Sequence, residues 1–292
     1  MDTIIDSWSS YDRIGNNTPT LTPIYFKEME EYIQHKSLSI GLVAKFNVDH
    51  LVGGIPPKGD KTDIITDNFV GIGYHDVLGG LKLSTRNAEI NSRIIDYILA
   101  KENLNPNTPT INFMDKYVLR KNINEYEKII FLPGSNLFNT IDWDKIDEIL
   151  LDNPTAVIKT HPITNPESIR FLENLYGCDK LIVDTNAAEL IGSTTLIWSS
   201  YNSEIGLIAA HKKIPLGNIS KWSDAFKHIY SPIYRHFKYK NVIHNKEIVD
   251  KIIFSDESGF IFPSQYDWRI RIDNWFDNLS RFKKGLRYPY SA

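Results

Sequence analysis

Short apolar runs alternate with longer segments of helical period through the second half of the chain. The runs are TAVIK from Thr155, KLIV from Lys180 and TLIWSS from Thr195. Apolar runs of this length are typical of buried parallel strands, and the longer segments between them are typical of the helices in βαβ units. The pattern therefore predicts a parallel sheet buried between helices.

Polar residues stand where each of these predicted strands ends, with Asp184 at the end of the second. Lys159 and His161 close the first run, and Ser199 and Ser200 close the third. In open parallel sheets, ligands bind outside the carboxyl ends of the strands. We therefore expect the functional site at this edge of the predicted sheet.

The first half of the chain is punctuated by a glycine-rich segment, GIGYHDVLGG, at residues 71–80. It follows a predicted strand over Phe69–Ile72 and precedes a predicted helix over Ala88–Lys101. Glycines after a strand allow a ligand to approach the backbone, and His75 with Asp76 places a base and a carboxylate in one loop. The alternative is a loop whose glycines only turn the chain.

Further helices are predicted over Asp142–Leu151, Val242–Phe254 and Tyr266–Phe282 from their apolar periodicity. Ahead of the first of them, EKIIFLPGSN predicts a strand that ends in a Pro-Gly turn. Gly134 and Ser135 in this turn form a candidate phosphate-binding or interdomain loop. Turns of this kind also occur in α/β folds without such a role.

The length of 292 residues and the hydrophobic content of 42% suit two cores of ordinary size. A polar stretch, KNINEYEK, begins at Lys121 and lacks an apolar period. We place the link there, and predict an α/β domain over 1–120, a second α/β domain over 121–265, and a terminal helix with a basic tail over 266–292.

The net charge of −3 gives no global basic field for nucleic acid, although it leaves room for a local basic patch. One cysteine, Cys178, cannot form an internal disulfide, which favours a reducing compartment. The N-terminal segment has no basic region, and nowhere do 18 apolar residues run together. These features predict a cytoplasmic protein with no integral membrane segment.

Three signals converge on the predicted sheet edge. His161, with Lys159 two residues earlier, could donate a hydrogen bond to a phosphate oxygen, or it could only cap the strand. Ser199 and Ser200 precede a helix and could form an anion site or an ordinary N-cap. Glu204 could accept hydrogen bonds from a ribose diol or compensate the helix dipole. Together they suggest a nucleoside mono- or diphosphate held at this edge.

These residues resemble a known family. Lys-x-His-Pro at 159–162, the pair Ser199 and Ser200, Glu204 five positions after the first serine, and an apolar helix running into KIPL at 213–216 look like the donor-binding half of GT-B glycosyltransferases. The nearest types are the capsule, teichoic-acid and bacterial sialyl- or Kdo-transferases. The resemblance implies that the histidine and the serines contact donor phosphates and that the glutamate lies near the nucleotide.

The resemblance covers Glu127 to about Leu216 and leaves out the first 120 residues. Teichoic-type enzymes carry an aspartate two residues before the serine pair, where this chain has Ile197. This departure argues against a polyol-phosphate transferase and favours the capsule type.

The resemblance also implies a fold and a mechanism. The fold would be α/β, with two Rossmann-like doubly wound domains that face a cleft: an acceptor-side domain over 1–120 and a nucleotide-sugar-binding domain over 121–265. The enzyme would move a sugar from a nucleotide-sugar co-substrate to an acceptor hydroxyl, with no other cofactor. Asp76, then His75, then Asp12 are the candidate general bases. No HExxH or paired-Cys motif occurs, and no metal is expected.

Three alternatives stay open. The basic and aromatic stretch Lys221–Lys240 and the tail Arg281–Arg287 could bind a polyanion, either an anionic glycan or DNA, so a transferase acting on modified viral DNA is one of them. Such a stretch is more often a solvated surface. A nucleotide-sugar epimerase would share the donor half, and a non-catalytic module would bind a nucleotide or glycan without turnover.

Overall fold

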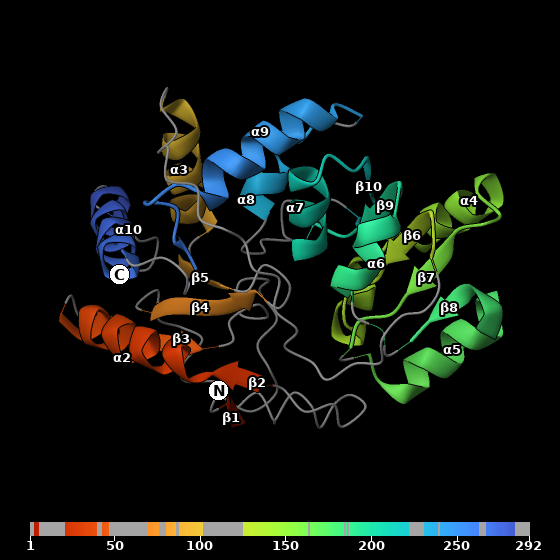
Figure 1. Cartoon of the computed structure of the whole chain (residues 1–292), viewed down its shortest axis with the longest axis horizontal. Coiled ribbons are helices and arrows are strands. Elements are labelled where there is room, and N and C mark those ends of the chain that lie inside the picture. The colour runs from red at the N-terminus through yellow and green to blue at the C-terminus, as the bar shows by residue number, and fades with distance from the viewer. Residues whose placement is uncertain are drawn as a thin grey trace, which may run out of the picture.

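The computed structural model describes residues 3–5, 21–39, 43–46, 69–75, 80–85, 88–101, 125–162, 164–183, 185, 187–201, 203–221, 231–238, 240–262 and 267–283. These residues form a five-stranded sheet, a four-stranded sheet and a two-stranded ribbon of β1 (Thr3–Ile5) and β2 (Leu21–Pro23). Figure 1 shows the five-stranded sheet and its helices on the right, and the four-stranded sheet with its helices on the left.

The five-stranded sheet is parallel throughout, as the alternating pattern predicts. Its strands are β6 (Lys128–Phe131), β7 (Val157–Lys159), β8 (Leu181–Ile182), β9 (Leu196–Ser199) and β10 (Leu216–Asn218). Their order is β10-β9-β6-β7-β8, so the chain runs outward from β6 to one edge and then returns to build the other side. This is the order of a doubly wound, Rossmann-like sheet.

Both faces of this sheet are covered, which explains why its strands are almost wholly apolar. One face packs on α4 (Trp143–Asp152) and α5 (Pro166–Tyr176). The other face packs on α6 (Ala187–Ser193), α7 (Glu204–His211) and α9 (Val242–Ile253). Neighbouring residues of one strand enter opposite cores, as Ile129 and Ile130 do in β6.

Polar residues begin the helices of this half. The side chains of Asp142, Asn165, Ser203 and Asn241 accept hydrogen bonds from backbone N–H groups in the first turns of α4, α5, α7 and α9. Pro166 follows Asn165 at the start of α5, where a proline fits because no intrahelical N–H bond is lost. The predicted helices over Asp142–Leu151 and Val242–Phe254 are thus confirmed to within two residues.

The four-stranded sheet is mixed. Its strands are β3 (Val43–Phe46), β4 (Phe69–His75), β5 (Gly80–Thr85) and β11 (Phe260–Ile261), in the order β11-β5-β4-β3. Only β3 and β4 are parallel. Within the part of this half that the structure describes, a second doubly wound sheet is therefore not confirmed.

The glycine-rich segment is largely strand, which corrects the predicted loop at 71–80. β4 continues through His75, which pairs with Gly80 of β5 in an antiparallel hairpin. Gly71 and Gly73 lie inside β4, where they pair with Ser84 and Lys82 of β5. His75 is thus a strand residue, while Asp76 lies outside the described residues.

Three helices cover one face of the four-stranded sheet: α2 (Ile24–Ser39), α3 (Ala88–Ala100) and α10 (Trp268–Lys283). The predicted helices over Ala88–Lys101 and Tyr266–Phe282 are confirmed. Their core includes Leu81 and Leu83 of β5 together with Trp275 of α10. β11 and α10 follow the five-stranded half in the chain, yet they complete the core of the first half. The predicted link near residue 120 lies outside the described residues and stays a prediction.

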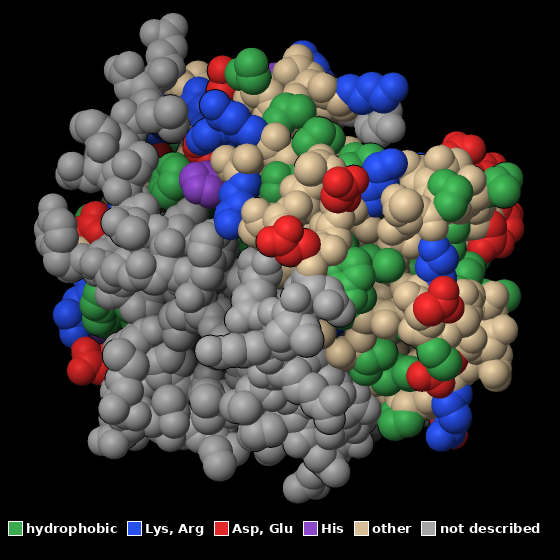
Figure 2. Space-filling model, turned by 45° about the vertical axis from the view of Figure 1, so that its right-hand side comes forward, with side chains coloured by type: hydrophobic (Ala, Val, Ile, Leu, Met, Phe, Trp, Pro, Cys, Tyr) green, Lys and Arg blue, Asp and Glu red, His purple; other side chains and the backbone are tan. Residues whose placement is uncertain are grey.

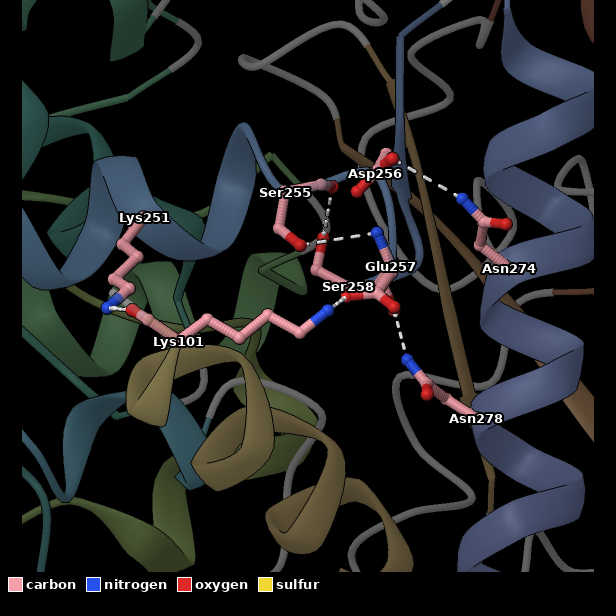
Figure 3. Close-up of polar contacts among 8 residues, drawn as sticks. All are labelled: Lys101, Lys251, Ser255, Asp256, Glu257, Ser258, Asn274 and Asn278. Atoms are coloured by element: carbon pink, nitrogen blue, oxygen red, sulfur yellow. Dashed lines mark hydrogen bonds and ion pairs between the residues drawn. The ribbon is translucent and has the colours of Figure 1, made fainter. Parts of the chain in front are cut away.

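The segment 254–259 connects α9 to β11 and joins helices from both halves (Figure 3). Glu257 forms an ion pair with Lys101 at the end of α3, and its carbonyl oxygen accepts a hydrogen bond from Asn278 of α10 at 3.5 Å. Lys251 of α9 donates to the carbonyl oxygens of Leu99, at 2.8 Å, and of Lys101. The end of α3 is thereby held against α9 and α10 at this crossing.

Lys82 of β5 lies buried beside the same segment. Its Nζ donates hydrogen bonds to the carbonyl oxygens of Leu83, at 2.7 Å, and Ser258, at 2.6 Å, and lies 5.0 Å from the centre of the Phe260 ring. The side chain makes no ion pair within the described ranges. Because burial disfavours the ammonium ion, the pKa of Lys82 falls to about 7.

No helix in the described part of the chain is long and apolar enough to cross a bilayer.

Replacing Lys82 by methionine should change how stability depends on pH. Between pH 7 and the ordinary lysine pKa, the unfolded chain holds a proton at Lys82 that the folded protein has released. The free energy of unfolding of the unmodified protein should therefore rise by about 2 kcal/mol from pH 7 to pH 9, relative to Lys82→Met. Urea unfolding at several pH values measures the difference. Lys221→Met, which removes an exposed lysine, is the control, and a difference constant with pH would contradict the depressed pKa.

Candidate functional site

The centre of the five-stranded sheet is the point at which its winding reverses. Phe131, at the end of β6, pairs with Lys159 of β7 on one side and with Ser199 of β9 on the other. From β7 the chain continues toward β8, and from β9 it continues toward β10, in opposite directions along the sheet. In doubly wound sheets, ligands bind at the carboxyl ends of the strands, at the point where the loops diverge in this way.

The loop after β6 is tied to the loop after β7. Leu132 extends the ladder by donating its N–H to the carbonyl oxygen of Lys159 at 3.0 Å. Gly134 then begins a short 3-10 helix, η2 (Ser135–Thr140). The Ser135 hydroxyl accepts the N–H of Asn165 at 3.1 Å, which fixes the start of α5 against this loop. Gly134 is buried and Ser135 half-buried.

The loop after β7 carries the predicted histidine. Lys159 is buried, and its Nζ donates to the carbonyl oxygen of Thr160. His161 is half-buried, and its carbonyl oxygen accepts the N–H of Thr164 at 2.9 Å in a tight turn. The Thr164 hydroxyl is buried and has no hydrogen-bond partner among the described residues. Since β7 ends at Lys159, strand alternation does not relate the direction of the Lys159 side chain to that of His161.

The loop after β9 leads into α7. Ser199 and Ser200 are buried, and the carbonyl oxygen of Ser200 accepts the N–H of Ser203 at 3.1 Å. Ser203, not the predicted pair, is the N-cap of α7, with its hydroxyl accepting the N–H of Ile205 at 3.2 Å. Glu204 is half-buried in the first turn. The first turn of α7 thus brings backbone N–H groups and one carboxylate to the carboxyl-end edge of the sheet.

Two tyrosines support the start of α7. The Tyr234 hydroxyl donates to the carbonyl oxygen of Ser203, and its ring centre lies 5.1 Å from that of Tyr201. Burial raises the pKa of both tyrosines, so both hydroxyls stay protonated at neutral pH. The Ser199 hydroxyl lies next to Tyr234 and partly offsets the rise in the pKa of Tyr234. The two hydroxyls do not have the geometry of a hydrogen bond. Tyr234 therefore acts as a fixed donor beneath the α7 cap.

The structure brings the predicted donor-binding residues to one edge, in two groups. Lys159, Ser199 and Ser200 are buried, so they lie beneath the surface of this edge. Ser135, His161 and Glu204 reach the surface in part. Contact of any of them with a ligand stays a prediction.

The predicted general bases lie largely outside the residues that the structure describes. The side chain of His75, in β4, is outside what the structure describes, as are Asp12 and Asp76 altogether. Among the described residues, no three His, Cys, Asp or Glu side chains lie close enough to hold a metal ion.

Three residues of this edge have no place in the sequence-based prediction: Thr164, Asn165 and Tyr201. Tyr234 enters it only as part of the stretch Lys221–Lys240, not as a residue of this site. The Asn-Pro pair at 165–166 is a helix-start signal and could have indicated the cap of α5. Tyr234 is 31 residues from the carbonyl oxygen that it binds, and no local pattern marks it.

Comparisons with known protein families and with curated proteins give no match. Among solved structures, one similar chain is named as a UDP-N-acetylglucosamine 2-epimerase from Listeria monocytogenes. It is 10% identical, with a TM-score of 0.26 over 56% of this chain and 47% of that chain. The match thus spans less than half of the epimerase chain, and a likeness this low says nothing about activity.

Close packing at the start of α7 makes Gly206 a test of this geometry. A methyl group at Gly206 would lie 2.1 Å from the Tyr234 hydroxyl oxygen and 2.9 Å from its ring. Gly206→Ala should therefore displace Tyr234 and lower the free energy of unfolding by about 1–3 kcal/mol in urea titration.

Gly192→Ala is the matched control. Gly192, in α6, has nothing within 4 Å of an added methyl group, so its replacement should be neutral or raise stability by up to about 1 kcal/mol. If both variants lowered the free energy of unfolding equally, the close contact between Gly206 and Tyr234 would not be the cause of the loss.

Proposed function

We propose that this protein is a glycosyltransferase of the GT-B type that takes its sugar from a nucleotide-sugar donor. The observation that carries the proposal is the convergence of Ser135, His161 and Glu204 at the reversal point of a doubly wound parallel sheet. That position is where such sheets bind nucleotides. The resemblance of the Lys-x-His-Pro and Ser-Ser motifs to the donor half of these enzymes supports the same assignment.

The groups at this edge suit a leaving nucleoside phosphate. When the bond between the anomeric carbon and the phosphate oxygen breaks, negative charge develops on the phosphate. The N–H groups of the first turn of α7 and the ring of His161 are donors that could stabilise this charge. Such donors act best when they are already fixed, and the hydrogen bonds of Ser203 and Tyr234 fix the start of α7.

Glu204 gives the edge a preference for one orientation of the nucleotide. A carboxylate repels phosphate but accepts hydrogen bonds from a ribose diol. Its place in the first turn of α7 therefore favours a ribose near Glu204 and the phosphates toward His161. The acceptor hydroxyl would lose its proton to a base from the first half, for which Asp76 is the first candidate, ahead of His75 and Asp12.

The proposal predicts that one family of nucleotides stabilises the protein. A ligand that binds only the folded state adds to the free energy of unfolding, by about 2.7 kcal/mol at a concentration one hundred times its Kd. The melting temperature rises as a result. Thermal-shift measurements with UDP-, GDP-, CMP- and dTDP-sugars and with the free nucleotides would identify the donor class. His161→Ala should reduce the shift, while His35→Ala, an exposed histidine of α2, should retain it. No shift with any nucleotide would remove the basis for the donor site.

A second prediction separates the base from the donor site. Asp76→Asn should lower turnover by at least about a hundredfold, because a general base contributes that much or more, while it leaves the nucleotide-induced thermal shift unchanged. Product formation with a glycan acceptor and the thermal shift are measured on the same preparation. Full activity in Asp76→Asn would transfer the role to His75 or Asp12.

The same assay distinguishes an epimerase from a transferase. An epimerase converts the donor without an acceptor, so a new nucleotide sugar in an acceptor-free incubation would replace the transferase assignment. Nucleotide binding with no consumption of donor under either condition would indicate a binding module.

A further inference from the structure

The outer side of α4 and α5 carries exposed apolar side chains. Phe171 and Leu175 lie one turn apart on α5 and are 55% and 52% exposed. Leu151, in the last turn of α4, is 80% exposed. They are three of the six large apolar side chains that lie exposed in the part of the chain that the structure describes. Single exposed apolar side chains are common, but a group of them on one layer is typical of a contact surface.

One contact between the two helices places these side chains on a common surface. The Tyr176 hydroxyl, at the end of α5, donates to Asp147 Oδ1 of α4 at 2.9 Å. Leu151 lies one turn after Asp147, on the same side of α4. Leu175 directly precedes Tyr176 in α5. We call the surface formed by Leu151, Phe171 and Leu175, with the carboxylates beside them, the α4–α5 face.

The surroundings of these apolar side chains are acidic. The two helices carry six Asp and Glu residues against two cations, Lys145 and Arg170. In Figure 2, which turns this side toward the viewer, apolar side chains lie among Asp and Glu side chains on the right-hand side. Five of the six carboxylates are exposed, and none of these makes an ion pair with a residue that the structure describes: Asp144, Asp147, Glu148, Asp152 and Glu167. Their negative charge is therefore available to a cationic partner.

These charges decide which partner fits the face. A symmetric contact between two α4–α5 faces would bring the carboxylates of one molecule against those of the other, which is unfavourable. A segment that carries cations beside apolar side chains would instead cover Phe171 and Leu175 and pair with the carboxylates around them. The complement of the face is therefore a cationic and partly apolar segment.

The chain contains such a segment after α10. Residues 281–292 read RFKKGLRYPYSA, with four Lys and Arg and no Asp or Glu. Leu286, Tyr288 and Tyr290 supply apolar groups between and after the cations. α10 ends at Lys283, and residues 284–292 lie outside the described part of the chain.

A second segment of similar charge is less suited. Residues 235–246 also hold four Lys and Arg and no Asp or Glu. They lie in the turn before α9 and in α9 itself, where Arg235 pairs with Asp96 and Lys246 pairs with Asp250. Two of the four cations of this segment are thus already neutralised within the molecule.

The segment after α10 would reach the face of another molecule and not its own. α10 and α5 lie at opposite ends of the long axis of the molecule (Figure 1). A compact chain of 292 residues has a radius of gyration of about 19 Å and is therefore about 50 Å across. The nine residues 284–292 span at most about 30 Å when fully extended. A contact between this segment and the α4–α5 face therefore joins two molecules.

We propose that residues 284–292 of one molecule bind the α4–α5 face of a second molecule. The apolar side chains of the segment cover Phe171 and Leu175, and Lys284 and Arg287 pair with the carboxylates of α4. Because the two contacting surfaces differ, the association is head-to-tail and either closes into a ring or continues as a chain of molecules. The proposal does not rest on the proposed transferase function, because it uses none of the candidate site residues.

The first test removes the apolar part of the face in the full chain. In sedimentation velocity, the average mass of the unmodified protein should rise with protein concentration and fall with added salt. Phe171→Ser/Leu175→Ser should weaken this association at least about tenfold, because apolar contact area is lost. Leu38→Ser/Ile243→Ser, which replaces side chains that are 68% and 65% exposed on α2 and α9, should associate like the unmodified protein.

An exchange of charges tests the ionic part of the contact. Lys284→Glu/Arg287→Glu and Glu148→Lys/Asp152→Lys should each weaken association at least about tenfold, because like charges then face one another. The chain that carries all four changes should regain association, since opposite charges meet again.

Lys221→Glu/Lys238→Glu is the control for net charge. It reverses two exposed lysines elsewhere on the molecule and should leave association unchanged. All the substituted side chains are exposed or follow α10, so every variant should keep the melting temperature of the unmodified protein. A mass that stays that of a monomer at every concentration would overturn the proposal. So would association that survives reversal of Lys284 and Arg287, or a chain with all four changes that does not regain it.

Discussion

The double burial of the parallel sheet around β6 constrains the rest of the structure. A strand covered on both faces can present polar groups only at its ends, because a side chain along its length would enter one of two apolar cores. Ile129 and Ile130 show this, since consecutive residues of β6 enter different cores. Polar chemistry is thereby confined to the sheet edge, and the reversal of winding at β6 selects the point where the loops diverge.

The two halves are joined by contacts that come late in the chain. β11 and α10 return to the first sheet, and Phe260 and Phe262 enter the core of the second half together with Ile95 of α3. The polar crossing at Glu257 and Lys101 lies beside this apolar contact. Lys82 is buried there and makes no ion pair with any residue that the structure describes, and two backbone carbonyl oxygens offset part of the cost of its burial.

The start of α7 is held in place by its neighbours. Ser203 caps its first turn, and the hydroxyl of Tyr234 donates to the carbonyl oxygen of Ser203. Tyr234 also fills the space beside Gly206, where a methyl group would lie 2.1 Å from its hydroxyl oxygen. Donors that are fixed in this way need no rearrangement when negative charge develops beside them.

Local sequence determined the helices and strands of the second half and the clustering of Ser135, His161 and Glu204 at one edge. Periodicity and capping residues such as Asn165 act over a few positions, so they can be recognised without tertiary information. Three features were decided by the tertiary structure alone. Pairing with β5 made the glycine-rich segment a strand, the return of the chain placed β11 and α10 on the first sheet, and packing within the second half buried Ser199 beneath the edge. Each depends on contacts between segments far apart in the chain, which no local pattern records.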